Sequence, residues 1–327
     1  MTREEFYRTV YDETVSRLSD CYKKDEIVLR KQTEMGRTVM MLMFIKEGSP
    51  FSPSFNLDEY YEEYLIMMPQ EEYISEIEKV GRHHVTDLER YRSLNLDRFE
   101  NVIDKISIRL SALKNEEPDT LLHTIKFDHF IAEFRINLNS DDRESYCPPV
   151  FEKQFRDWFI TDEILLNAAY MNQMKEGIIL SPLDEAKISD GFQLKKNYWI
   201  DPPAQEEARA AGLLVLTNPA GSFGASLILN QAVLQRIYWI LGVNYYILPS
   251  SVHEVMILAD NGNYDAEKIS DLVRRVNESE VLAMDVLADE VFFYDAAKDR
   301  MITGREHAKE KMCAFGKAQE MLMAGQL

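Results

Sequence analysis

Cysteine is scarce in this sequence of 327 residues, which holds only Cys21, Cys147 and Cys313. An odd number of distant cysteines does not favour a disulfide framework, and a reducing compartment is expected. Long apolar segments are also lacking, because the longest run, residues 39–45, is much shorter than the ~20 residues that span a bilayer. The N-terminus starts with charged residues and lacks the apolar segment of a secretory signal. We therefore expect a cytoplasmic protein that does not enter a membrane.

Positive charge is in short supply. The chain has 37 Lys and Arg against 56 Asp and Glu, which gives a formal net charge of -19. Such a balance repels phosphate backbones and anionic lipids, and this argues against nucleic-acid binding and membrane-surface binding. It favours solubility and a basic protein as the partner. Hydrophobic residues make up 46% of the chain, which is enough to bury the core of a globular protein.

The motifs of several enzyme classes are missing. The sequence contains no G-x-x-x-x-G-K-[ST] or G-x-G-x-x-G for nucleotides, no G-x-S-x-G for a serine hydrolase and no H-E-x-x-H for zinc. His83 and Asp87 are four residues apart and would share a helix face, but no third ligand has a matching register. We therefore expect no cofactor and no bound zinc or iron.

Hydrophobic periodicity predicts an α+β fold with antiparallel sheet units and helices packed on one side. Helices are expected after the N-cap residues Thr2, Asn56 and Thr161. Strands are expected where polar and apolar residues alternate, or where an apolar run is bounded by turns. The strands predicted in the first half of the chain are residues 27–31, 37–45, 106–110 and 130–138, and Glu34-Met35-Gly36 forms the turn between the first two.

The last third of the chain has the clearest order of elements, which is a hairpin, a helix, a second hairpin and a second helix. Such an order builds an antiparallel sheet. The predicted parts are strands 213–217 and 223–229, helix 231–241, strands 245–248 and 252–258, and a helix capped by Asp265. The regions expected along the chain are 1–145, 146–211, 212–303 and a final amphipathic helical region, 304–327.

Polar residues gather at the turns of the two predicted hairpins. The candidate binding residues are Asn218 in the first turn and Ser250, Ser251, His253 and Glu254 at the second. Strand alternation places Ser251 and His253 on the opposite face from Glu254, so this segment alone cannot form a catalytic triad. We expect His253 to be half-buried and hydrogen-bonded, and to stabilise the fold rather than to catalyse a reaction.

The region from Glu47 to Glu78 contains no Lys or Arg, and tyrosines are interleaved with its acidic residues. Carboxylates beside tyrosines can form a docking face for a basic protein. The structural alternative is a solvated helix face whose tyrosines pack inward. The candidate partner face consists of Tyr60, Tyr61, Glu62, Glu63 and Tyr64.

Two groups of motifs resemble an uncharacterised protein family. The N-terminal group comprises Met35-Gly36, Ser52-Pro53 and LDEYYEEY at residues 57–64. The more specific C-terminal group comprises residues 216–218, 223–225, LPSSVHEV at residues 248–255, and Val276-Asn277. Together they resemble domain-of-unknown-function family 5688 of anaerobic gut bacteria, from the N-terminus to about Tyr294. The resemblance implies no mechanism, because the family has no established activity.

Two functions are compatible with the sequence. The first is a non-catalytic binding or regulatory protein, which the missing catalytic motifs and the acidic region favour. The second is an enzyme of an unrecognised type with its polar site at the C-terminal hairpin turns. The geometry of the two turns distinguishes them, because an enzyme needs the turns to converge on one concave pocket. The sequence predicts no oligomeric state.

Overall fold

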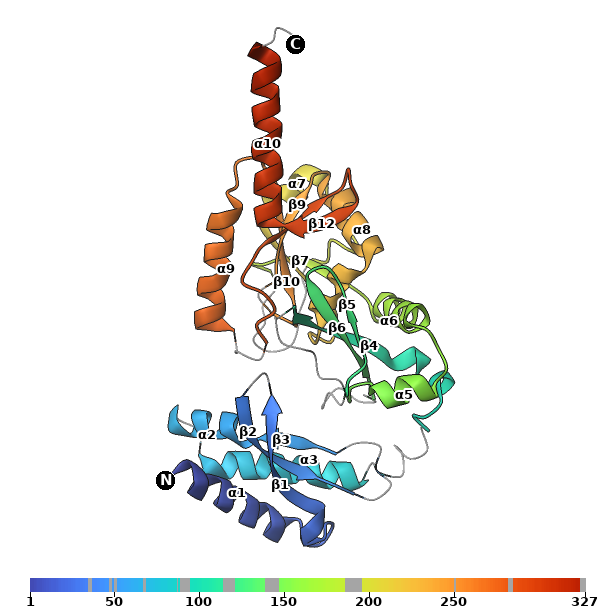
Figure 1. The fold of residues 1–327 in the computed structure, drawn as a ribbon, viewed down its shortest axis with the longest axis vertical. Coiled ribbons are helices and arrows are strands. Elements are labelled where there is room, and N and C mark those ends of the chain that lie inside the picture. The colour runs from blue at the N-terminus through green and yellow to red at the C-terminus, as the bar shows by residue number, and fades with distance from the viewer. Residues whose placement is uncertain are drawn as a thin grey trace. The chain divides into compact units, whose positions relative to one another are not determined.

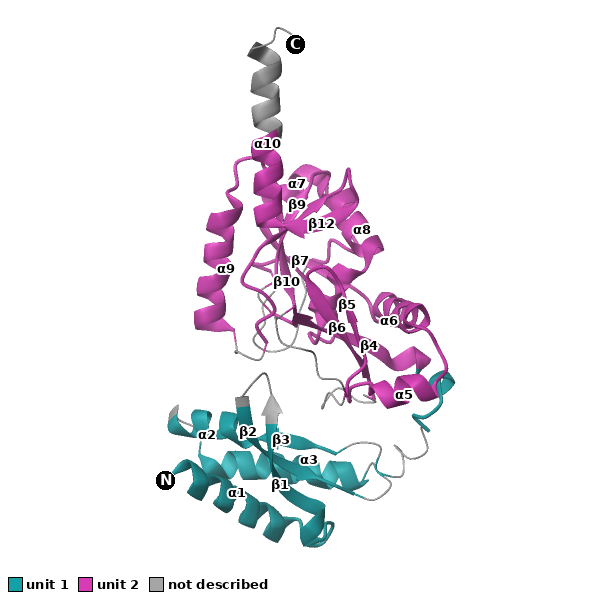
Figure 2. Cartoon of the chain, in the orientation of Figure 1, with its two compact units in different colours: residues 1–102, 115–118 teal, residues 103–114, 119–327 magenta. Residues whose placement is uncertain are grey.

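The described chain forms two compact units, which Figure 2 shows in two colours. Of the described residues, those from Met1 to Val102 belong to unit 1 and those from Ile103 onwards belong to unit 2. In this computed structural model every strand pair among the described residues is antiparallel, so the predicted α+β class is confirmed. The described residues are 1–34, 37–46, 49, 52–66, 69–86, 88, 95–113, 121–138, 147–185, 196–249, 251–281 and 285–323.

Unit 1 is a three-stranded sheet in the order β1-β2-β3, with helices against one face (Figure 1). Leu42 and Phe44 of β2 are fully buried and pack in one cluster with Phe6 of α1 and Tyr73 of α3. The elements of unit 1 are α1 (Arg3–Arg17), the 3-10 helix η1 (Lys24–Glu26), β1 (Ile27–Glu34), β2 (Arg37–Phe44), β3 (Ser54–Asn56), α2 (Leu57–Ile66), α3 (Gln70–Thr86) and the 3-10 helix η2 (Phe99–Asn101).

The predicted helix starts of unit 1 are confirmed by their caps. Thr2 Oγ1 accepts from the Glu5 backbone N–H at 3.3 Å, and Thr2 N–H donates to the Glu5 carboxylate at 2.8 Å, which completes a capping box. At the start of α2, Asn56 Oδ1 accepts from the Asp58 backbone N–H at 3.1 Å. The predicted hairpin of β1 and β2 is also confirmed by its register, although residues 35 and 36 of its turn lie outside the described residues.

Unit 2 contains a six-stranded sheet in the order β12-β11-β9-β10-β8-β7 and a three-stranded sheet in the order β4-β6-β5. The pairing of β4 with β6 confirms the two alternating strands predicted there. The elements of unit 2 are η3 (Ile103–Lys105), β4 (Ile106–Ala112), β5 (Thr124–Lys126), β6 (Phe130–Ile136), α5 (Glu152–Asp157), α6 (Asp162–Glu176), β7 (Ile179–Pro182), α7 (Gln205–Ala210), β8 (Leu213–Thr217), η4 (Gly224–Leu229), α8 (Gln231–Leu241), β9 (Tyr245–Leu248), β10 (Val255–Ala259), α9 (Ala266–Glu280), β11 (Phe292–Asp295), β12 (Arg300–Thr303) and α10 (Gly304–Met323).

The six-stranded sheet has helices on both faces, so the predicted packing of helices on one side does not apply to this sheet. Tyr246 of β9 packs in a cluster with Ile269 of α9, whereas the neighbouring Tyr245 points to the other face and donates from its hydroxyl to the Leu234 carbonyl of α8 at 2.9 Å. On that second face the rings of Phe292 and Phe130 lie 5.0 Å apart and join the two sheets. No helix of the described residues is long and apolar enough to cross a bilayer.

The prediction of a first hairpin in the last third is wrong. Residues 213–217 form β8, but residues 224–229 form the 3-10 helix η4 instead of its partner strand. The antiparallel partners of β8 are β10 and β7. The second hairpin is confirmed by the pairing of β9 with β10, although β10 begins at Val255 rather than at residue 252.

Candidate functional site

The segment from Thr217 to Asn230 crosses unit 2 along one face of α6. Tyr170 donates from its hydroxyl to the Leu229 carbonyl at 2.9 Å, and Gln173 Nε2 donates to Ser226 Oγ at 2.9 Å. These two residues of α6 are three positions apart and therefore lie on the same side of the helix. They hold η4 in place, so the turn that precedes η4 has a defined position.

The Asn218 side chain closes that turn. Its Nδ2 donates to the Ser222 carbonyl at 2.9 Å, its Oδ1 accepts from the Ser222 N–H at 3.1 Å, and its carbonyl accepts from the Gly221 N–H at 3.0 Å. Gly221 has φ of 61°, a conformation that favours glycine. The Glu176 carboxyl lies beside Asn218. Desolvation by the surrounding protein raises the pKa of this carboxyl, and a hydrogen bond with the Asn218 side chain lowers it. The Asn218 amide is therefore used mainly to build the turn.

The two predicted turns meet at His253. The Phe223 backbone N–H donates to His253 Nδ1 at 3.3 Å, and the Thr217 hydroxyl donates to the His253 carbonyl at 2.9 Å. The rings of Phe223 and His253 also stack, with 5.7 Å between centroids. Because Nδ1 accepts a hydrogen bond, the ring proton is assigned to Nε2, which lies 3.4 Å from Asp285 Oδ1.

The Ser251 side chain bonds to the backbone of the same turn. Its buried Oγ accepts from the His253 backbone N–H at 3.0 Å, and its main chain bridges to Val286. The hydroxyl therefore contacts the main chain of His253 rather than the ring nitrogens, which is not the arrangement of a nucleophile and its base. The strand alternation expected for residues 251–254 does not apply, because these residues precede β10. Ser250 lies outside the described residues.

Glu254, which follows His253 in the chain, is half-buried. Burial raises the pKa of its carboxyl, His253 lowers it, and Asp285 raises it. A raised carboxyl pKa stabilises the fold below the ordinary glutamate value of about 4.3, and this contribution is lost as the pH rises through the folded-state pKa. At pH 7 the ionised carboxylate therefore opposes folding.

We predict that Glu254→Gln raises the melting temperature at pH 7 and that this gain disappears near pH 4. Thermal melts at both pH values measure the effect. Glu278→Gln, which changes an exposed carboxylate of α9, serves as the matched control. A lower melting temperature for Glu254→Gln at pH 7 would show that the ionised carboxylate has a stabilising partner.

Three residues around His253 were not indicated by the sequence patterns, namely Phe223, Arg135 and Asp285. Phe223 has φ of 57° and ψ of 21°, a left-handed conformation that is costly for a residue with a Cβ and that persists only where the surroundings enforce it. The Arg135 guanidinium lies 5.5 Å from the centre of the Phe223 ring, and Asp285 faces His253. The flanking glycines are the local signal that could have identified Phe223, whereas Arg135 and Asp285 have none.

Among the residues that the structure describes, no group of three or more metal-ligating side chains is close enough to hold an ion. Asp87, the predicted partner of His83, lies outside those residues. A different histidine, His123, has one carboxylate at each ring nitrogen: Glu152 at 2.8 Å from Nδ1 and Asp162 at 3.0 Å from Nε2. Both nitrogens face protein partners, so His123 links the start of α5 to the start of α6.

The candidate partner face separates into tyrosines and carboxylates. Tyr60, Tyr61 and Tyr64 are half-buried and pack against the core of unit 1, where Tyr60 stacks on Tyr73 at 4.8 Å. Glu62 and Glu63 are exposed on the same helix. Only the carboxylates therefore present an open surface, together with the exposed Glu71, Glu72 and Glu76 of α3.

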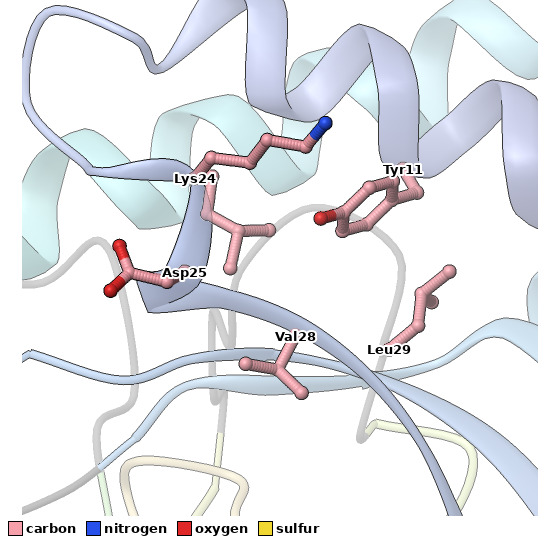
Figure 3. Close-up of a pocket in the computed structure, with 6 residues that line it drawn as sticks. Tyr11, Lys24, Asp25, Val28 and Leu29 are labelled. Atoms are coloured by element: carbon pink, nitrogen blue, oxygen red, sulfur yellow. The ribbon is translucent and has the colours of Figure 1, made fainter.

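Unit 1 also has a wide hollow of about 650 Å³ between α1 and β1, shown in Figure 3. Its walls are mainly apolar, and Lys24 and Asp25 are its only charged residues. The hollow is lined by Tyr11, Lys24, Asp25, Ile27, Val28 and Leu29. This set contains no histidine, cysteine or hydroxyl nucleophile other than the Tyr11 phenol, so it offers little for catalysis.

Comparison with protein-family models identifies a family for this chain. Residues 3–296 match the model of a family of unknown function, DUF5688, which covers most of the chain. No curated protein and no solved structure is significantly similar to the chain. The match agrees with the resemblance carried by the N-terminal and C-terminal motifs.

Proposed function

The chain belongs to the family of unknown function DUF5688, and from its geometry we propose that it is a non-catalytic binding protein of the cytoplasm. Its ligand is a basic protein that docks on the acidic surface of α2 and α3. This acidic surface consists of Glu62, Glu63, Glu71, Glu72 and Glu76. The observation that carries the proposal is that these carboxylates are exposed while the tyrosines beside them are packed inward.

Exposure of the carboxylates supports a role outside folding. The side chains of Glu62 and Glu71 are 67% and 65% exposed. Their ion pairs, with Arg3 at 3.6 Å and Arg17 at 2.8 Å, are surface pairs that solvent and salt screen, so they contribute little to stability. The burial of the neighbouring tyrosines supplies the packing energy of the helices, so the carboxylates are available for a partner.

The geometry at His253 supports a binding protein over an enzyme. A general base needs a free lone pair within reach of substrate, but Nδ1 of His253 accepts from the Phe223 N–H. The Nε2 side faces Asp285 and carries the proton. The Asn218 and Ser251 side chains bond to the main chain of their own turns. The alternative of an enzyme with a site at these turns therefore has less support.

The proposal predicts that neutralising four carboxylates weakens partner binding and leaves the fold intact. The variant is Glu62→Gln, Glu63→Gln, Glu71→Gln and Glu72→Gln. Its free energy of unfolding should change by less than about 1 kcal/mol, because like charges on one helix cost only a few tenths per pair. Affinity capture from a lysate of the native host, with mass spectrometry, should recover a basic protein with the wild type and not with the variant.

A matched control removes the same charge from unit 2. The control variant changes Glu206, Glu207, Glu267 and Glu278, which are also exposed, to Gln. It should capture the same basic protein as the wild type. Equal capture by both four-fold variants would contradict the acidic surface as the docking site, and loss of more than about 2 kcal/mol of stability in the first would assign its carboxylates to folding.

A further inference from the structure

Two of the three tryptophans of the chain lie together on the surface of unit 2. Trp239 of α8 is 57% exposed, and Ile200, next to Trp199, is 77% exposed. The Arg236 guanidinium lies over both indoles, 4.6 Å from the centre of the Trp239 ring and 5.9 Å from the centre of the Trp199 ring. Exposed aromatic groups beside an arginine are typical of the residues that carry most of the energy of protein interfaces.

The turn that presents Trp199 and Ile200 is held firmly to the sheet. Asn197 Oδ1 accepts from the Leu180 N–H of β7 at 3.1 Å and from the Trp199 N–H at 3.0 Å. Asn197 Nδ2 donates to the Ile178 carbonyl at 2.9 Å. The exposed side chains of this turn therefore have a defined position, which lowers the entropy cost of binding.

The end of α8 is held by α7, which packs beside it (Figure 1). Gln205 Nε2 donates to the Trp239 carbonyl at 3.0 Å, and Arg209 Nη1 donates to the Leu241 carbonyl at 2.7 Å. Gly242 follows with φ of 70° and ends the helix. The Trp239 and Leu241 carbonyls, which lie in the last turn of α8, thus accept hydrogen bonds from α7. Trp239 therefore lies on a helix end that is held in place.

Arg236 has no carboxylate within ion-pair distance among the described residues, although the chain carries 56 Asp and Glu. Arg236 is half-buried, and its guanidinium lies over two indoles. Its five donors match a carboxylate in two-point geometry. Of the apolar groups in this region, Trp239 and Ile200 are exposed and Trp199 is half-buried. The complement of this surface is a carboxylate flanked by an apolar side chain.

We propose that Trp199, Ile200, Arg236 and Trp239 form a docking surface for a peptide segment of a partner protein in which an Asp or Glu stands next to a large apolar residue. The carboxylate pairs with Arg236, and the apolar side chain packs on Ile200 and Trp239. This surface is independent of the acidic surface on unit 1, because it selects the opposite charge.

The test uses a phage-displayed library of random 12-residue peptides selected on the full chain. Selected peptides should be enriched in Asp or Glu within two positions of Leu, Ile, Phe or Trp. Synthetic copies should bind the wild type at least tenfold more tightly than Arg236→Gln. Arg275→Gln, which removes an exposed arginine of α9, should bind them like the wild type.

Three outcomes would overturn the proposal. The first is the absence of enriched peptides, and the second is enrichment of neutral or basic peptides. The third is equal binding by the wild type and Arg236→Gln, with both variants folded by circular dichroism. Sedimentation equilibrium provides a separate check, because a dimer that Trp239→Ala abolishes would assign this surface to a second copy of the chain instead.

Discussion

Replacing Gly224 with alanine is expected to lower the free energy of unfolding by about 3 kcal/mol. A Cβ at this position would stand 2.6 Å from the His253 carbonyl oxygen and 2.9 Å from the Asn218 nitrogen, and it would also contact the Thr217 hydroxyl. Two of these neighbours are main-chain atoms, which cannot move aside without opening the junction of the two turns. Urea unfolding with an unchanged m-value measures the loss.

Gly262→Ala is the matched control for the cost of a left-handed glycine. Gly262 has φ of 80° and open space around its Cα, so its alanine variant carries only backbone strain of about 1–2 kcal/mol. Gly224 shows the opposite combination, with crowding and no left-handed φ. If Gly224→Ala is less destabilising than Gly262→Ala, the two turns are packed less tightly than the structure shows.

Replacing His253 with alanine is expected to lower the free energy of unfolding by about 1–3 kcal/mol. The variant removes the ring that stacks on Phe223 and leaves the Phe223 N–H without its acceptor. Phe223 is held in a left-handed conformation, so the variant loses a hydrogen bond at a strained position of the backbone. Urea unfolding measures the change, with partner capture as the second readout.

Asp285→Asn is the control for a catalytic role of the same histidine. Asp285 Oδ1 lies 3.4 Å from Nε2, which is a long contact, so the amide variant should change stability by less than about 1 kcal/mol. A catalytic histidine would depend on this carboxylate to orient its ring. If His253→Ala keeps full stability while a native activity disappears in both variants, the structural role assigned to His253 is wrong.

Local signals made much of the fold predictable. Helix α8 begins where Asn230 Oδ1 accepts from the Ala232 N–H at 3.1 Å, and it ends at Gly242 with φ of 70°. Helix α6 begins at the Thr161 cap and ends before Gly177, a glycine with φ of 106° and an otherwise extended conformation. Both ends are fixed by side chains within a few residues, so sequence alone predicts them.

Residues 224–229, for which a strand was wrongly predicted, lack such a local signal. Residues 224–228 are all buried, and a segment that is buried on every side shows neither the period of a strand nor that of a helix. Its conformation depends on contacts with distant residues, such as Gln173 of α6 and the carbonyl of Val252. Tertiary packing, rather than a local sequence signal, therefore determines that residues 224–229 form a 3-10 helix.

The candidate site was predicted only in part for the same reason. The sequence placed Asn218 in a hairpin turn and His253 at the start of a strand, whereas His253 precedes β10 in the structure. The meeting of the two segments depends on the Phe223 N–H and on packing around Gly224. The contact of Asp285 with His253 also joins distant parts of the chain. Spacing in a sequence does not indicate such contacts.

The most direct test of the proposed function is a titration of the captured basic protein, once purified, against the wild type and the two four-fold variants at several salt concentrations. Binding through the exposed carboxylates of α2 and α3 predicts an affinity that falls with salt for the wild type. It also predicts at least a tenfold loss, with weaker salt dependence, for the variant at Glu62, Glu63, Glu71 and Glu72. Equal affinities and equal salt dependence for the two variants would contradict the acidic surface as the binding site.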